Sequence, residues 1–339
     1  MDDSTATTTE AQETEQEVSD VGVTSSTARV IRNVGVLDLS GLDSPEALDN
    51  VTSMANVGVI IVPEPLLPKL SRIAMRNVGI TIPVPKGAKL HQFTGQTVLS
   101  GEALANPDGS MDDVLLVSGQ LAITSPVQKV GFGQIIASGQ VLAPEGSAST
   151  LGPGFSRMSG QVSYYPYTEG AAVRVQVGSQ RVSGKALANP AGQPTDILLV
   201  VGSLIATSPV EQLGYQHIAV IGTVLAQAGS EDALEGRVTS LGGGTIYYSA
   251  PPRVFDGKDS FGPAFFEYLD EPITWVLSGS FTIDDDVSPD LVRQKIAAVV
   301  LSGKLTAPRD VASLIQARAL TKSGVIKVSG ADGTDSDRD

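Results

Sequence analysis

The chain has 339 residues, a formal net charge of −14, no cysteine and only two histidines. The lack of cysteine excludes disulfides, thiolate nucleophiles and cysteine-ligated metal sites. No run approaches the ~18 apolar residues of a membrane-spanning helix, and no basic start followed by an apolar stretch marks a secretory signal. We therefore predict a cytoplasmic protein without membrane insertion.

Most of the negative charge lies at the two ends of the chain. Residues 1–28 hold seven acidic residues and no Lys or Arg, and residues 331–339 hold four Asp and one Arg. Polar, acidic segments of this kind bury too little apolar surface to fold, so we predict two disordered acidic tails. The body between them is close to neutral and offers no basic surface for nucleic acid.

Between the tails, a glycine followed by a short apolar or alternating run recurs about every 20 residues. The first examples are NVGVLDL, which ends at Leu39, and NVGVIIV, which ends at Val62. Such a pattern is typical of a solenoid in which each turn of the chain stacks on the one before. We predict a mainly β fold over residues 29–330, a single elongated parallel β-solenoid of ~20-residue rungs.

A larger repeat is superimposed on this short one. Residues 100–165 align without a gap with residues 183–248, and 30 of the 66 aligned positions are identical. A repeat of about 80 residues groups the rungs into four modules. We place these modules at about 29–107, 108–190, 191–272 and 273–330.

Ser-Pro pairs mark possible helix starts within the modules. They begin at residues 44, 125, 208 and 288. A serine hydroxyl accepts hydrogen bonds from the free amides at a helix start, and proline suits the first helical position. The runs after Ser44 and Ser288 have apolar residues at helical spacing, whereas the middle slots contain glycine, as in 152–154. We therefore predict short helices in the first and last modules.

An aromatic-rich run from Pro251 to Pro272 replaces one expected rung of the third module. Aromatic side chains dominate the energetics of protein interfaces, so this run is our candidate interaction surface for a partner protein. The alternative interpretation is an aromatic mini-core that covers a weak flank of the solenoid. The residues of the candidate surface are Phe255, Phe261, Phe265, Phe266, Tyr268 and Trp275.

The remaining polar residues form no recognisable reactive motif. His217 is replaced by Gln134 in the other copy, and His91 has no nucleophile-elbow motif near it. The acidic run 284–286 lacks the calcium-loop patterns, and the Ser-Gly steps lack the spacing of a phosphate-binding loop. We predict no catalytic, metal-binding or cofactor-binding residue, and no cofactor.

The two copies share turn glycines, prolines and apolar residues, which favours a structural role. We predict a non-enzymatic structural or scaffold protein, a β-solenoid rod that self-associates or presents a docking surface, so its partner is itself or another protein. The alternative is a polysaccharide-binding or polysaccharide-cleaving β-helix protein. The layout, a β-solenoid between two tails, resembles that of the bactofilins, whose short rungs lack the Ser-Pro slots, and no residue roles are carried over.

Overall fold

The computed structural model describes residues 28–330. The two predicted disordered tails lie outside the described residues, apart from Ala28. The chain divides into two compact units, residues 1–86 and 87–339. Strands account for 51% of the structure, so the predicted mainly β character is confirmed.

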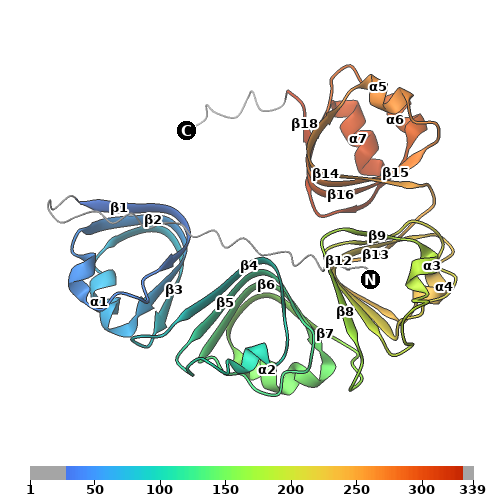
Figure 1. The fold of residues 1–339 in the computed structure, drawn as a ribbon. Helices are drawn as coiled ribbons and strands as arrows, with labels where there is room; N and C mark the ends of the chain where they lie inside the picture. Colours follow the sequence, from blue (N-terminus) through green and yellow to red (C-terminus); the bar gives the residue numbers. More distant parts are fainter. Residues whose placement is uncertain (1–27, 331–339) are drawn as a thin grey trace, which may run out of the picture. The chain divides into compact units, whose positions relative to one another are not determined.

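The strands form four separate parallel sheets, one in the first unit and three in the second (Figure 1). The prediction of a single elongated β-solenoid over 29–330 is wrong, because in the described chain no backbone ladder joins the last strand of one sheet to the first strand of the next. Short helices accompany all four sheets, not only the first and last. The sheets cover residues 29–84, 90–165, 173–248 and 252–328, whereas the predicted modules ended at 107, 190, 272 and 330.

The first sheet has the order β1-β2-β3. Its elements are β1 (Arg29–Asp38), β2 (Val51–Pro63) and β3 (Ala74–Val84), with the helix α1 (Leu67–Leu70) between the last two strands. The Ser44-Pro45 pair begins only a single 3-10 turn, Pro45–Leu48. Apolar side chains from the strands and turns, including Met54, Ile60 and Leu66, form the core of this unit.

The second and third sheets are related by the sequence duplication. The second consists of β4 (Leu90–Leu99), β5 (Val114–Ile123), β6 (Gln134–Pro144) and β7 (Phe155–Tyr165), with α2 (Ala148–Gly154) before its last strand. The third consists of β8 (Val173–Val177), β9 (Gln180–Val182), β10 (Ile197–Val201), β11 (Leu204–Ala206), β12 (His217–Gln227) and β13 (Val238–Tyr248), with α3 (Gly184–Leu187) and α4 (Glu231–Leu234). Helix α2 forms although it contains two glycines and a proline, since packing of Leu151 into the core overrides weak propensity.

The fourth sheet has the longest helix beside it. Its strands are β14 (Pro252–Phe261), β15 (Ile273–Ile283), β16 (Ile296–Ala307), β17 (Ala319–Lys322) and β18 (Val325–Val328). Its helices are α5 (Pro263–Glu267), α6 (Pro289–Lys295) and α7 (Arg309–Arg318). Helix α6 begins as expected from its Ser-Pro pair, because the Ser288 hydroxyl accepts a hydrogen bond of 3.2 Å from the amide of Leu291.

The second, third and fourth sheets each contain a line of paired glycines with positive φ, whereas in the first sheet Asn33, Asn56 and Asn77 have positive φ. In the second sheet, Gly119 pairs with Gly139, which pairs with Gly160, and their φ angles lie between +129° and +144°. A Cβ atom at Gly139 would lie 1.9 Å from the carbonyl oxygen of Gly119, so no other residue fits without a shift of the backbone. The bent strands lie side by side as nested arches, with helices at the open side (Figure 1).

The arch of the second sheet encloses an apolar core and also packs outward. Leu115 and Leu121 point inward, where they meet Leu151 of α2. On the outer face, Ala122 and Leu142 pack against a cluster of the third sheet that contains Ile197, Leu199 and Ile221. Because both faces of these strands are buried, their amino-acid sequences are nearly continuous apolar runs.

The third and fourth sheets meet in the same manner. Ile205 and Leu225 on the outer face of the third sheet pack with Val276 and Val300 of the fourth. The strand halves that contact a neighbouring sheet are therefore apolar on both sides. This arrangement explains how three short sheets combine into one compact unit.

Candidate functional site

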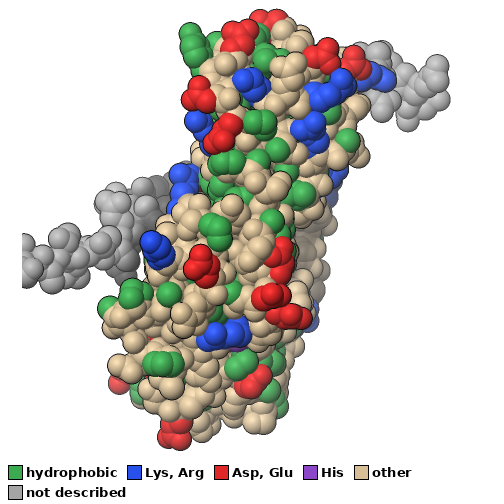
Figure 2. Space-filling view, turned by 90° about the vertical axis from the view of Figure 1, so that its right-hand side faces the viewer, with side chains coloured by type: hydrophobic (Ala, Val, Ile, Leu, Met, Phe, Trp, Pro, Cys, Tyr) green, Lys and Arg blue, Asp and Glu red, His purple; other side chains and the backbone are tan. Residues whose placement is uncertain are grey.

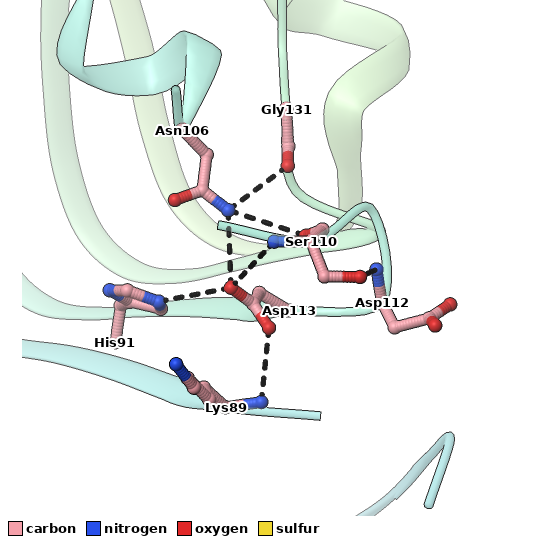
Figure 3. Close-up of polar contacts among 7 residues, drawn as sticks. All are labelled: Lys89, His91, Asn106, Ser110, Asp112, Asp113 and Gly131. Carbon is pink, nitrogen blue, oxygen red and sulfur yellow. Dashed lines mark hydrogen bonds and ion pairs between the residues drawn. The ribbon is translucent and has the colours of Figure 1, made fainter. Parts of the chain in front are cut away.

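A buried carboxylate marks the candidate site in the second sheet. Asp113 immediately precedes β5, and its side chain is 2% exposed. It accepts hydrogen bonds from the backbone amides of Ser110 and Lys89, both at 3.1 Å, and from Nδ2 of Asn106 at 3.2 Å. Nε2 of His91, on β4, lies 3.3 Å from the same carboxylate (Figure 3). The carboxylate thus ties β4 to the turn that leads into β5.

These contacts fix the charge of Asp113. Burial favours the neutral acid and acts to raise the pKa, but the hydrogen bonds from Ser110, Lys89, Asn106 and His91 favour the carboxylate and lower the pKa to about 2. The group is therefore ionised at neutral pH. A carboxylate with this pKa and four donors around it serves as an anchor and not as a general acid.

Asn106 holds the other half of this cluster. Its backbone is left-handed, with φ of 47°, a conformation that asparagine tolerates better than most residues. Its Nδ2 also lies 3.3 Å from the carbonyl oxygen of Ser110 and 3.2 Å from that of Gly131. Gly131 approaches so closely that an added Cβ would lie 1.9 Å from the carbonyl oxygen of Ala105. The turn before β5 is thereby clamped to the loop before β6.

The third sheet contains the same cluster. Asn189, with φ of 48°, donates to Asp196 at 3.2 Å, and the amide of Gln193 donates to the same oxygen at 3.1 Å. The hydrogen bond from Asn189 is the largest cause of the lowered pKa of Asp196, and the hydrogen bond from the Gln193 amide is the second largest. Arg174 takes the place of the imidazole, with its Nε 3.1 Å from the carboxylate. The Asn, the Asp and one backbone amide of the turn are common to both sheets. The side chain on the first strand differs, and Asp196 has no counterpart of the hydrogen bond from the Lys89 amide among the described residues.

Because Arg174 stands in the third sheet where His91 stands in the second, base catalysis by His91 cannot be a function that the two clusters share. An arginine is protonated at all physiological pH values and cannot act as a base. The ring of His91 packs edge-on against Phe132 at 5.3 Å, and within residues 28–330 its other ring nitrogen has no hydrogen-bond partner. What both clusters can do is hold neighbouring strands and turns in register.

A polar groove lies where the second, third and fourth sheets meet. It has a volume of about 350 Å³ and no Lys, Arg or His in its lining. One wall is a ladder of glutamines, in which Gln96 donates to Gln120 at 3.1 Å and Gln120 donates to Gln140 at 3.2 Å. The opposite walls present serine and threonine hydroxyls, and Asp256 is the single charged residue. Aliphatic residues complete the lining, so the groove offers neutral polar groups beside apolar surface.

The six aromatic residues of the predicted interaction surface lie mostly in the core of the fourth sheet. Phe261, Phe266 and Trp275 are at most 2% exposed, and Phe255 and Phe265 are partly buried against them. Trp275 lies edge-on to Phe261 at 4.8 Å, and its Nε1 is buried without a hydrogen-bond partner among the described residues. Tyr268 alone projects outward, with 84% of its surface exposed. Docking of a partner on this cluster stays a prediction, and Tyr268 is the member of the cluster whose side chain is exposed for such a contact.

Sequence reasoning missed the Asn-Asp clusters, although a signal was present. Asn106 and Asp113 are identical to Asn189 and Asp196 at the 83-residue offset.

In residues 28–330, no group of three or more His, Cys, Asp or Glu is placed to hold a metal ion. The helices of that range include none with the length and apolar character needed to cross a bilayer. Comparisons with protein-family models, with curated proteins and with solved structures found no match.

Proposed function

We propose that this protein has a structural role and self-associates by adding strands of one copy to the free sheet edges of another. The cytoplasm is the location we predict for it. The observation that carries this proposal is the placement of charge on the strands. Sheet edges present unpaired amides and carbonyls, and proteins commonly protect them with charged side chains.

Charge on the strands is almost confined to sheet edges. The described strands contain eleven Lys and Arg residues, and ten of these lie on strands that pair on one side only. Among the interior strands, β16 alone is charged, through Lys304. A lysine or arginine at an edge must stay hydrated and so opposes pairing with another strand. Most edges of this protein are therefore protected.

Two edge strands lack this protection. They are β4, the first strand of the second sheet, and β13, the last strand of the third. Neither contains Lys, Arg, Asp or Glu. Since one is a first edge and the other a last edge, β13 of one copy can extend the second sheet of another copy as a parallel strand. Contacts between two different surfaces of this kind are heterologous and build rings or open chains.

The surface chemistry supports pairing through the backbone. On the face shown in Figure 2, apolar side chains are scattered singly, and Lys and Arg are interspersed with Asp and Glu. Scattered apolar side chains are ordinary for a protein surface and do not mark an apolar interface. Strand addition needs only the hydrogen-bonding groups of the edge and a matching register.

Sedimentation of the full chain tests this proposal. We expect species heavier than the 35.1-kDa single chain, in proportions that rise with protein concentration. The Thr94→Lys substitution on β4 places an ammonium group at the unprotected edge and should return the protein to 35.1 kDa. Ser159→Lys is the matched control, because Ser159 lies in the same row of paired residues on β7, an edge that already carries Arg157.

The control separates edge pairing from a general effect of added charge. Ser159→Lys should leave the concentration dependence unchanged. A native chain that sediments as a 35.1-kDa species at every concentration, or two variants with identical behaviour, contradicts the proposal.

A further inference from the structure

A groove of about 460 Å³ crosses the three strands of the first unit. Arginines stand at both of its ends, on the two edge strands β1 and β3. The residues that form the floor between the two arginines carry no charge. The lining residues are Arg32, Ser53, Met54, Ala55, Asn56, Ala74, Met75 and Arg76.

The two arginines occupy one row of the sheet. Arg32 pairs with Ala55, and Ala55 pairs with Arg76, so two strand spacings, roughly 10 Å, separate their backbones. Both side chains are exposed, and neither has an acidic partner within residues 28–330. The groove therefore offers two guanidinium groups without an acidic partner in the described chain, carried on strands that lie two strand spacings apart.

Two of the five acidic residues in the described part of the first unit pair with lysines. Asp49 pairs with Lys69, and Asp43 lies 3.4 Å from Lys86. The arginines of the groove are left without a counter-charge from the described part of this unit. Guanidinium groups bind carboxylates in bidentate geometry, so an acidic peptide is the ligand that this chemistry favours.

We propose that the groove binds the protein's own N-terminal segment, residues 1–27. This segment contains seven acidic residues and no Lys or Arg. It joins β1 directly, and its last acidic residue, Asp20, precedes Arg29 by nine positions. Nine residues can span up to about 30 Å, so the acidic positions reach the groove from their own chain.

The tether compensates for the weakness of exposed ion pairs. A single pair between exposed charges contributes little, and salt screens it further. A short covalent connection, however, raises the effective concentration of the segment to the millimolar range. Binding within one chain is therefore favoured over capture of a separate acidic protein.

A second copy of the first sheet is a poorer occupant of these edges. If β3 of one copy extended the sheet beyond β1 of another, the row through Arg32 and Arg76 would place two arginines beside each other. Like charges directly opposite one another destabilise a strand pair. The charge of this groove thus excludes a sheet edge and accepts an acidic segment.

Carbodiimide cross-linking of the full chain tests the proposal. The reagent joins a carboxylate to a contacting amine as an amide and takes up the water that is released. Arg76→Lys places an amine in the groove, and Arg72→Lys is the matched control, since Arg72 is exposed in the same unit but does not line the groove. Mixed ¹⁵N-labelled and unlabelled chains show whether each cross-link lies within one chain or between two.

We expect position 76 to link to acidic residues of 1–27 in the same chain. The yield should fall about fivefold or more in about 0.5 M NaCl, where the Debye length is roughly 4 Å. Position 72 should give no such link. The proposal is overturned if position 76 links no more than position 72, or if the links join different chains. Either result leaves the self-association through β4 and β13 untouched, because that assay uses other strands.

Discussion

Replacement of Asp113 by alanine should destabilise the protein strongly. The change removes one carboxylate that accepts four hydrogen bonds. His91 is 37% exposed and can turn to water, and Asn106 retains the carbonyls of Ser110 and Gly131. The amides of Ser110 and Lys89 lose the carboxylate they pair with.

The size of the effect follows from those two amides. Both hydrogen bonds are part-buried, and a hydrogen bond to a charged group contributes about 1.5–3 kcal/mol, so the loss of unfolding free energy should be about 2–5 kcal/mol. The matched control is Asp112→Ala, because the Asp112 side chain is exposed and accepts no recorded hydrogen bond in the described chain. Its expected effect is within about 0.5 kcal/mol.

The same cluster predicts a dependence on pH. The pKa of Asp113 is about 2 in the folded chain, below its ordinary value of 3.8. A depressed pKa stabilises the fold above about pH 4, and this stabilisation is lost as the pH falls from about 4 through 2. The difference between the native chain and Asp113→Ala should therefore shrink in acid.

Urea unfolding followed by far-UV circular dichroism measures both effects. The midpoints of the native chain, Asp113→Ala and Asp112→Ala are compared at neutral pH and at about pH 3. The reasoning is refuted if the two alanine variants unfold at the same urea concentration at neutral pH. It is also refuted if the deficit of Asp113→Ala is as large in acid as at neutral pH.

Two further predictions concern a bend and a histidine. Gly139→Ala should lower the thermal midpoint, at a cost of about 2 kcal/mol or more, because its Cβ would lie 1.9 Å from a backbone oxygen at φ of +139°. Gly152→Ala in α2 is the control, since its Cβ meets nothing within 4 Å, and an equal loss there would contradict the steric argument. Burial lowers the pKa of His217 to about 4 in the folded chain, so between about pH 6.5 and 4 only the unfolded chain takes up a proton at this residue. The free energy of unfolding should therefore decrease as the pH falls from about 6.5 to 4. His217→Gln should flatten this slope in urea midpoints between about pH 7 and 5, and an unchanged slope would count against the assignment.

The glycine pattern predicted strand register correctly but not where each sheet stops. Gly119, Gly139 and Gly160 line up across neighbouring strands as expected for successive rungs. Within a sheet, bend glycines follow one another at 20 to 24 residues, but the steps between sheets are only 15 to 18. In the sequence, Gly101 and Gly184 also fit a recurrence of about 20 residues, and they conceal the short steps because they lie outside the bends. The first bends of the later sheets are at Gly95, Gly178 and Gly257.

The candidate site was harder to predict than the register. In the sequence, Asp113 is only a charge before an apolar run, because its donors are backbone amides and a side chain of β4, which only the fold brings together. Likewise, sequence spacing shows that Phe261 and Trp275 are near each other but not that both point inward. The restriction of Lys and Arg to edge strands, by contrast, was readable from the chain. It marks most sheet edges, but not β4 and β13, which contain no charged residue.

The outward packing of the sheets bears on how such a chain evolves. The copy that forms the third sheet packs one part of its outer face against the second sheet and another part against the fourth. Gain or loss of a whole copy therefore exposes no additional apolar surface, whereas gain or loss of part of a copy would expose it. Lineages carrying this design should differ in length by complete 83-residue increments.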